Sequence, residues 1–178
     1  MSTLTVWLQS DAEQMWPQAV TTATAAFERD HPKVKVRIAF LPWTSHLAKF
    51  SADTAAGEAP DVAEFGTSEL SGVVSSGELQ DVSADKSQFD NSSTWRAALL
   101  QPCQANGLLY CVPYYGAERS GTVIGGSVLG IPKAAQHPDL SAAWIKDFTS
   151  TANEQQFAAD GRKATGDTKV VSNTTAIP

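Results

Sequence analysis

The sequence has no segment suited to crossing a membrane and no basic cluster suited to a nucleic acid. No apolar run approaches the ~20 residues that a membrane-spanning helix needs. Lys and Arg make up only 13 of the 178 residues, and they are scattered along the chain. Phosphate backbones and anionic membrane surfaces both require clustered basic side chains. With a formal net charge of −6, the chain is expected to bind neither nucleic acid nor a membrane surface.

The chain is also poor in residues that hold metals or carry out nucleophilic catalysis. Its histidines, His31, His46 and His137, are scattered, and none lies near a Ser or Cys in a recognisable nucleophile setting. The phosphate-binding Gly-x-x-x-x-Gly-Lys loop and the Gly-x-Ser-x-Gly elbow are both missing. Two cysteines are too few for a structural zinc site. We therefore predict no metal, no cofactor and no enzymatic activity.

Two features bear on the cellular compartment. Cys103 and Cys111 enclose Asn106-Gly107, a dipeptide typical of a tight turn that would bring the two sulfurs within bridging distance. Two reduced, buried thiols are the alternative, and a disulfide is favoured if the protein is exported. The start of the chain, Met1 to Leu4, has neither a charged nor an apolar signal region. The protein is therefore either cytosolic or exported with its signal removed.

Strand-like and helix-like segments alternate along the chain. The predicted strands are residues 4–8, 34–38, 60–66, 108–113 and 127–132, and the predicted helices are 17–31, 45–56, 68–76, 94–101, 139–148 and 151–161. Ser10 with Glu13, and Thr151 with Glu154, have the spacing of capping boxes at helix starts. This alternation predicts an α/β domain with a mostly parallel five-stranded sheet covered by helices on both faces.

The composition fits one folded domain. Hydrophobic residues make up 42% of the chain, enough for a core, and 18% of the residues are charged. Residues 1–161 are predicted to form a single α/β lobe. From residue 162 to 178 the chain is polar and loses its periodicity. We expect this segment to be an extended or partly disordered tail.

Polar and aromatic residues gather where open α/β sheets bind ligands, at the carboxyl ends of strands. Gln9 and Asp11 follow the first predicted strand, and Phe65, Ser68 and Glu69 follow the third. A sugar needs carboxylate and amide partners for its hydroxyls beside a flat aromatic ring. Each residue also has a structural explanation. Asp11 suits a helix N-terminus, Glu69 a solvated first turn of a helix, and Phe65 the core.

Three further aromatic residues are candidate platforms for a sugar ring. Trp43 follows Pro42 in a predicted loop, where burial explains a large aromatic side chain less well. Tyr114 and Tyr115 form an adjacent pair just after the strand that follows the Asn-Gly turn. Together with the five residues named above, they make up the predicted ligand-binding set.

Several segments, in order over residues 4–160, resemble a maltose-binding-type extracellular solute-binding protein of ABC importers. The segments that carry the resemblance are Val6–Gln9, Ala26–Val36, Ala56–Val62, Gly107–Tyr115, Gly125–Lys133 and His137–Phe148. The resemblance implies a lobe of the type II periplasmic-binding-protein fold, a sugar or oligosaccharide ligand, docking on ABC-transporter membrane subunits, and an extracellular or periplasmic location.

The resemblance also implies roles for individual residues. Gln9 and Asp11 match positions that touch sugar hydroxyls, and Phe65 matches a stacking aromatic. Ser68 and Glu69 fall where maltose binders carry charged contacts but differ from them in type, which argues against maltose itself as the ligand.

The chain departs from the family between Tyr115 and Gly125, where members place a whole second lobe and this chain has only residues 116–124. The hypothesis is a hinge crossing with a shortened link near residues 113–126 and an excised second lobe, either engineered or natural. Weak or undetectable sugar binding follows from it, as does self-association through the exposed cleft and hinge. The alternatives are a scaffold or protein-interaction domain without a ligand and, through Tyr114 and Tyr115, a ferric-ion-binding protein.

Overall fold

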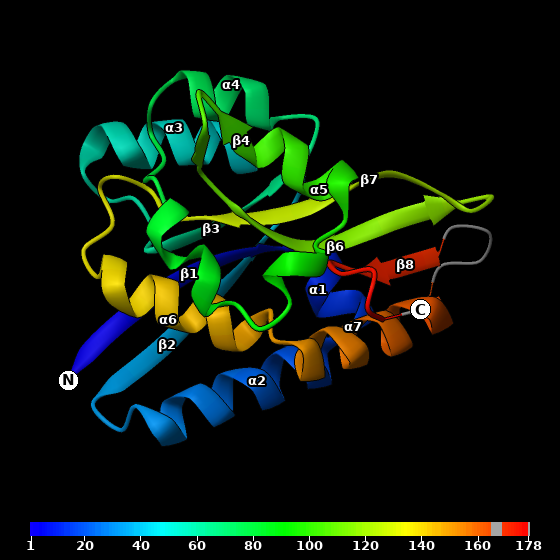
Figure 1. The fold of residues 1–178 in the computed structure, drawn as a ribbon. Coiled ribbons are helices and arrows are strands. Elements are labelled where there is room, and N and C mark those ends of the chain that lie inside the picture. The colour runs from blue at the N-terminus through cyan, green and yellow to red at the C-terminus, as the bar shows by residue number, and fades with distance from the viewer. Residues whose placement is uncertain (165–168, 178) are drawn as a thin grey trace.

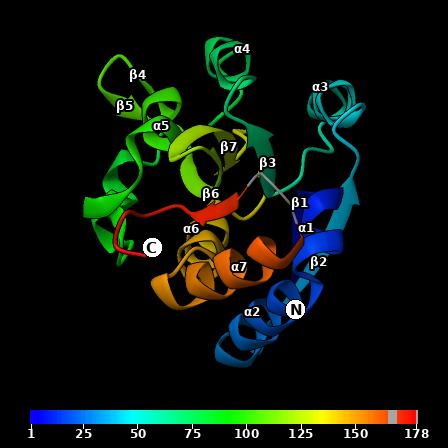
Figure 2. The ribbon, with the colours of Figure 1, turned by 90° about the vertical axis from the view of Figure 1, so that its right-hand side faces the viewer.

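A six-stranded sheet separates two layers of helices in the computed structural model, which describes residues 1–164 and 169–177 (Figures 1 and 2). The strand order is β2-β1-β3-β7-β6-β8. The strands of the sheet are β1 (Ser2–Gln9), β2 (Val34–Leu41), β3 (Val62–Gly66), β6 (Val112–Arg119), β7 (Thr122–Gly130) and β8 (Lys169–Ser172). Among the described residues, no helix is both long enough and apolar enough to span a bilayer.

The helices divide between the two faces of the sheet, as both views of the ribbon agree. One face carries α1 (Ser10–Met15), α2 (Pro17–Asp30), α6 (Pro138–Phe148) and α7 (Thr151–Ala164). The other carries α3 (His46–Ala56), α4 (Leu70–Ser75) and α5 (Ala97–Leu100). Short 3-10 turns span Ser83–Gln88, Ser92–Thr94 and Gln101–Cys103, and β4 (Gln104–Ala105) pairs with β5 (Leu108–Leu109).

The sheet is parallel at one edge and antiparallel at the other. β1 pairs in parallel with β2 and with β3, whereas β3 with β7, β7 with β6, and β6 with β8 are antiparallel pairs. The predicted α/β class with helices on both faces is confirmed. The predicted five-stranded, mostly parallel sheet needs correction, because β7 returns through a hairpin and β8 adds a sixth strand.

The first helical segment shows how local chemistry sets the element boundaries. α1 ends at Met15, and α2 begins at Pro17, where the missing proline N–H has no intrahelical partner to lose. Gln9 precedes α1, and no side chain forms a capping hydrogen bond there. The predicted start of the regular helix at Pro17 is confirmed, but the predicted Ser10–Glu13 capping box does not form.

The larger part of the core lies beneath α2, α6 and α7. Trp16 and Tyr114 are almost fully buried there, and the Trp16 indole Nε1 donates to the Tyr114 hydroxyl at 2.7 Å. Phe148 and Phe157 pack their rings against Tyr114. On the opposite face, Phe65 packs edge-on against Phe50 of α3, with 5.0 Å between ring centroids. Two aromatic clusters therefore hold the helices to the sheet.

The C-terminal segment differs from the predicted polar tail. α7 continues to Ala164, and β8 pairs with β6. Asn173 has no exposed surface, and its amide N–H donates to the carboxylate oxygen Oε2 of buried Glu154 at 2.8 Å. Glu154 therefore anchors this segment and does not complete the predicted capping box. The described part of the segment has no clear periodicity because it is a short strand followed by polar residues that are buried in the lobe.

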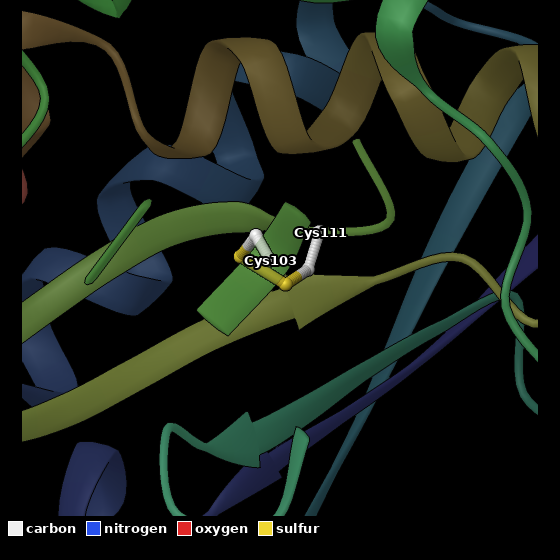
Figure 3. Close-up of a disulfide and its surroundings, with 2 residues drawn as sticks. All are labelled: Cys103 and Cys111. Carbon is white, nitrogen blue, oxygen red and sulfur yellow. A yellow bond between two sulfur atoms is a disulfide. The ribbon is translucent and has the colours of Figure 1, made fainter. Parts of the chain in front are cut away.

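The chain makes two tight hairpins, one in the separate β4–β5 sheet and one in the antiparallel half of the main sheet. In the first, Asn106 and Gly107 both have left-handed φ angles, +53° and +79°, as a two-residue turn between β4 and β5 requires. This turn brings Cys103 and Cys111 together in a buried disulfide, with their Cα atoms 5.0 Å apart (Figure 3). Both the predicted turn and the favoured disulfide are confirmed.

The second hairpin occupies residues 113–126, the region expected to hold the hinge crossing and shortened link. β6 is joined to β7 by the two-residue turn Ser120-Gly121. Both residues again have left-handed φ angles, +52° and +78°. Arg119 pairs with Thr122 directly across this turn. The segment between the two predicted crossings is therefore a continuous β-hairpin.

Candidate functional site

A groove of about 350 Å³ opens beside α1, between the loop after β2 and the β6–β7 hairpin. Among its lining residues are Asp11, Met15, Trp43, Tyr115, Ser127 and Val170. It combines a carboxylate, two aromatic rings and a hydroxyl. A hollow of about 290 Å³ beside Asp81 and Lys146 is of comparable size, but no aromatic ring lines it. The first groove is therefore the better candidate for a ligand with hydroxyls and an apolar face.

Trp43 is held against the sheet by two features. Its indole Nε1 donates to Asp11 Oδ2 at 2.8 Å, across 32 residues of sequence. Its ring also lies over Gly66 at the end of β3, where a Cβ atom would come within 3.4 Å of the ring. A side chain at residue 66 would crowd the indole, so the glycine allows Trp43 to lie beside the groove.

His46 links the Trp43 loop to the end of β3. It is 2% exposed; its Nδ1 lies 2.9 Å from the Trp43 carbonyl and its Nε2 lies 2.9 Å from Glu69 Oε2. Because a carbonyl only accepts, Nδ1 carries a hydrogen. The short distance between His46 Nε2 and Glu69 Oε2 also requires a hydrogen between them, carried by one of the two groups. Glu69 Oε2 accepts in addition from the Gly66 amide at 2.8 Å, so one carboxylate oxygen binds both segments.

The floor behind the groove is built on Gln9 and Glu64. The Gln9 amide N–H donates to Glu64 Oε2 at 2.7 Å, and the Gln9 side-chain Nε2 donates to the Glu64 carbonyl at 3.2 Å. Burial raises the pKa of the Glu64 carboxyl from 4.5 to about 7, although the hydrogen bond from Gln9 acts in the opposite direction. The nearby negative charges of Asp11 and Glu69 raise this pKa further.

The adjacent tyrosines have different environments. Tyr115 lines the groove and is 6% exposed. Burial, followed by the negative charge of Glu64, raises its pKa well above the ordinary value, so its hydroxyl keeps its hydrogen. Tyr114 is fully buried, and its hydroxyl accepts from Trp16. Because the Tyr114 oxygen is buried beside Trp16, the pair does not present two phenol oxygens at the groove. In the part of the chain that the structure describes, no group of three or more His, Cys, Asp or Glu could hold a metal ion.

The structure brings only part of the predicted ligand-binding set together. Asp11, Trp43 and Tyr115 meet at the groove. Gln9 lies buried behind them, and the side chain of Glu69 is engaged with Gly66 and His46. The Phe65 ring is fully buried against Phe50, so it is not open to stacking on a ligand, and Ser68 is exposed beyond the end of β3.

Sequence reasoning missed His46, Glu64 and Ser127. A charged residue inside the apolar segment Val62–Gly66 was a signal for Glu64, because a buried carboxylate needs a specific reason. His46 lies three residues after Trp43, close enough to support that loop. Ser127 gave no local signal, because only the pairing of β7 with β3 brings it to the groove.

Residues 9–124 match the family model for bacterial extracellular solute-binding proteins. None of the curated proteins matches the sequence. The fold is similar to the GacH receptor of Streptomyces glaucescens, solved unliganded and with acarbose (TM-score 0.80, 13% identity, 99% of this chain and 81% of that chain). It is also similar to maltose-bound MalE3 of T. maritima (TM-score 0.78, 12% identity, 99% of this chain and 83% of that chain).

A shorter match covers 65% of this chain and 30% of the substrate-binding protein Lmo0181 of Listeria monocytogenes in complex with cycloalternan, at 20% identity and a TM-score of 0.56. This chain thus spans under a third of that protein. At such identities these structures show the shared fold alone. The family match covers more than half of the sequence and agrees with the motifs along it, so the protein belongs to the bacterial extracellular solute-binding proteins.

Proposed function

We propose that this chain is the carbohydrate-binding lobe of an ABC-importer solute-binding protein, and that its groove binds a sugar or oligosaccharide. The observation that carries the proposal is the convergence of Asp11, Trp43 and Tyr115 on one groove. A sugar ring has an apolar face for an indole and hydroxyls for a carboxylate and a phenol. As a solute-binding protein, the chain is not an enzyme.

The groove assigns a part to each of these side chains. Trp43 is half-buried, with its indole N–H fixed by Asp11, so its ring is oriented before a ligand arrives. The Asp11 carboxylate has a second oxygen for a ligand hydroxyl. The Tyr115 hydroxyl can donate or accept. A pre-oriented ring lowers the entropy lost on binding.

Carbohydrate is also the ligand class of the similar structures. The GacH receptor was solved with acarbose, MalE3 with maltose and the Listeria protein with cycloalternan. These ligands differ from one another, so they support the class of ligand and leave its identity to experiment. The family description supports an extracellular or periplasmic location. The Listeria protein is an ABC substrate-binding protein, which supports delivery of the ligand to ABC-transporter membrane subunits.

We further propose that the chain is a single lobe whose partner lobe has been excised. The support is the β6–β7 hairpin, which turns through Ser120 and Gly121 where the family resemblance places a second lobe. A two-lobed binder traps its ligand by closing, and the transporter recognises the closed state. One lobe offers about half of the contacts and leaves the ligand in water, so affinity should be in the millimolar range.

Titration of the 15N-labelled chain with maltose, acarbose and cycloalternan, followed by NMR, tests this function at millimolar affinity. We expect at least one of the three to shift the Trp43 indole resonance and the amides of Asp11 and Ser127. The lack of any shift with all three at tens of millimolar would contradict carbohydrate binding. Micromolar affinity would contradict the weak binding proposed for one lobe.

Self-association through the exposed cleft and hinge stays a prediction. Tyr114 and Tyr115, the aromatic pair at the hinge crossing, are both buried and add no exposed apolar surface to it. Sedimentation at increasing protein concentration measures it directly, since a constant monomer mass would contradict it.

A further inference from the structure

Three buried oxygen atoms without a hydrogen-bond partner belong to Ser127, which lines the groove, and to Gln9 and Glu64, which are buried beside it. They are Gln9 Oε1, Glu64 Oε1 and Ser127 Oγ. Gln9 and Ser127 are each 1% exposed and Glu64 is 2% exposed. Buried polar atoms are normally satisfied, so unpartnered atoms gathered beside one groove indicate an occupant that completes them.

The strand register places these atoms near one another. Ser127 of β7 pairs with Gly66 of β3, and Glu64 lies two residues before Gly66. Residues two apart on a strand share a face, and directly paired residues do as well, so the Ser127 and Glu64 side chains lie on the same face of the sheet. Gln9 joins them because its side-chain amide donates to the Glu64 carbonyl.

The floor opens into the groove at Ser127. This residue lines the groove together with Asp11 and Tyr115. The preceding residues on β7 are Gly125 and Gly126, which have no side chain to cover it. A Cβ atom on Gly126 would lie 2.2 Å from the Tyr115 carbonyl oxygen, so the backbone here is packed too closely for any other residue. After these two glycines, Ser127 is therefore the residue of β7 whose hydroxyl reaches the groove.

The three atoms lack hydrogens to share. The Gln9 amide oxygen only accepts, Ser127 supplies a single hydroxyl hydrogen, and the Glu64 carboxyl supplies one only while it is protonated. The other Glu64 oxygen is already engaged by the Gln9 amide N–H. An occupant that satisfies the group must both donate and accept at short range, and a hydroxyl does both.

We propose that Ser127 and Glu64 form a hydroxyl-recognition subsite at the groove floor. In it, a ligand hydroxyl accepts from Ser127 Oγ and donates to Glu64 Oε1. Gln9 is a positioning residue that orients the Glu64 carboxylate through its backbone N–H. The inference rests on the proposed carbohydrate function and adds to it the residues that select a ligand by one deeply placed hydroxyl. An ordered water is the competing occupant.

The decisive variant is Ser127→Ala, titrated by NMR beside the wild type and Ser71→Ala with maltose and, in the same way, with acarbose and cycloalternan. Ser71 is an exposed serine on α4, away from the groove, and serves as the matched control. We expect maltose affinity to fall about tenfold in Ser127→Ala, because one hydrogen bond to the ligand is lost. Ser71→Ala should bind like the wild type. The urea midpoint of Ser127→Ala should change little, because the Ser127 hydroxyl makes no well-aligned hydrogen bond within the protein, although it lies close enough to the Glu64 carboxyl and the Tyr115 hydroxyl to lower the pKa of both groups.

A second variant, Glu64→Gln, tests the acceptor. The oxygen that accepts from the Gln9 N–H must stay an oxygen, so the new NH₂ group takes the place of Oε1. There it can donate to Gln9 Oε1, and the ligand hydroxyl loses its acceptor. We expect weaker maltose binding together with an unchanged or higher urea midpoint. If Glu64 had a purely structural role, maltose binding and the urea midpoint would fall together.

Each outcome bears on one of the two proposals. Equal maltose affinity in wild type and Ser127→Ala overturns the subsite and leaves carbohydrate binding intact. A lower urea midpoint of Ser127→Ala with unchanged affinity identifies the occupant as structural water, which also overturns the subsite. If the wild type binds none of maltose, acarbose and cycloalternan, the proposed function fails and the subsite fails with it.

Discussion

The two halves of the sheet contribute to the groove in different ways. Beyond the strand ends of the parallel half, β2-β1-β3, Trp43 and Glu69 lie in the turns after β2 and β3, and Asp11 lies in the first turn of α1 after β1. The antiparallel half, β7-β6-β8, contributes Tyr115 and Ser127 from within paired strands. Residues on loops can change without disturbing the sheet, whereas residues inside the hairpin are tied to the fold. Mutations in the two halves should therefore separate binding from stability.

The largest effect is expected from Gly126→Ala in the antiparallel half. An added Cβ would lie 2.2 Å from the Tyr115 carbonyl oxygen and 2.9 Å from the Gly116 Cα, both backbone atoms that cannot move away alone. We expect a loss of more than about 3 kcal/mol in the free energy of unfolding. Urea denaturation measures it.

The matched control is Gly72→Ala on α4. An added Cβ there meets nothing within 4 Å, so alanine should stabilise this helix by about 0.5–1 kcal/mol. If both alanine variants change stability equally, the close pairing of β6 and β7 at residue 126 is wrong.

The next largest effect is a pH dependence of the free energy of unfolding. It originates at Glu64 in β3, where the parallel and antiparallel halves of the sheet meet. The pKa of Glu64 is raised from 4.5 to about 7, mainly by burial. Between these values the folded protein keeps a proton that the unfolded chain releases, so rising pH favours unfolding. The stabilising contribution is complete below pH 4.5 and is lost as the pH rises through about 7, at a total of about 3 kcal/mol.

Urea unfolding between about pH 4.5 and 8, in wild type and Glu64→Gln, checks this sign. Glu64→Gln should remove the part of the pH dependence of unfolding free energy that Glu64 causes. Burial also raises the pKa of Glu154, so its slope has the same direction and should disappear in Glu154→Gln. Stability of the wild type that rises with pH across this range would show that Glu64 is ionised throughout.

Reduction of the disulfide should have a smaller effect, confined to the antiparallel half. Cys103 and Cys111 close a loop with a sequence separation of 8, and the loop-closure model gives about 2–3 kcal/mol for a loop of this size. The Cys103→Ser, Cys111→Ser double variant should lose this amount. Its Trp43 indole resonance should stay in place, because the bridge lies away from the groove. A shifted Trp43 resonance would mean that the two halves are coupled.

The same contrast explains how far the sequence could predict this protein. The Asn106-Gly107 turn, the disulfide, Pro17 at the start of α2, and the groove residues Asp11 and Trp43 all follow from local chemistry. β8 could not be predicted, because this short strand is positioned by its pairing with distant β6 and by the hydrogen bond from the backbone N–H of the next residue, Asn173, to Glu154. The roles of Phe65 and Ser127 depend on which face of a strand meets the groove, and that is set by sheet pairing.

The smallest effect is expected at Trp43 in the parallel half. Trp43→Phe keeps an aromatic ring beside Gly66 but removes the indole donor to Asp11, so we expect stability to fall by about 1 kcal/mol or less. Trp7→Phe is the matched control, since Trp7 lies under Lys49 and makes no contact with Asp11 that a phenylalanine would lose.

Sugar binding should respond more strongly than stability to Trp43→Phe. Without the bond to Asp11, the ring is no longer fixed before the ligand arrives, and the carboxylate regains water that a ligand hydroxyl must displace. Both changes oppose binding, so maltose affinity should fall severalfold in Trp43→Phe and stay unchanged in Trp7→Phe. Equal affinities in the two variants would place the ligand outside the groove, because a sugar seated there cannot avoid the indole and its carboxylate partner.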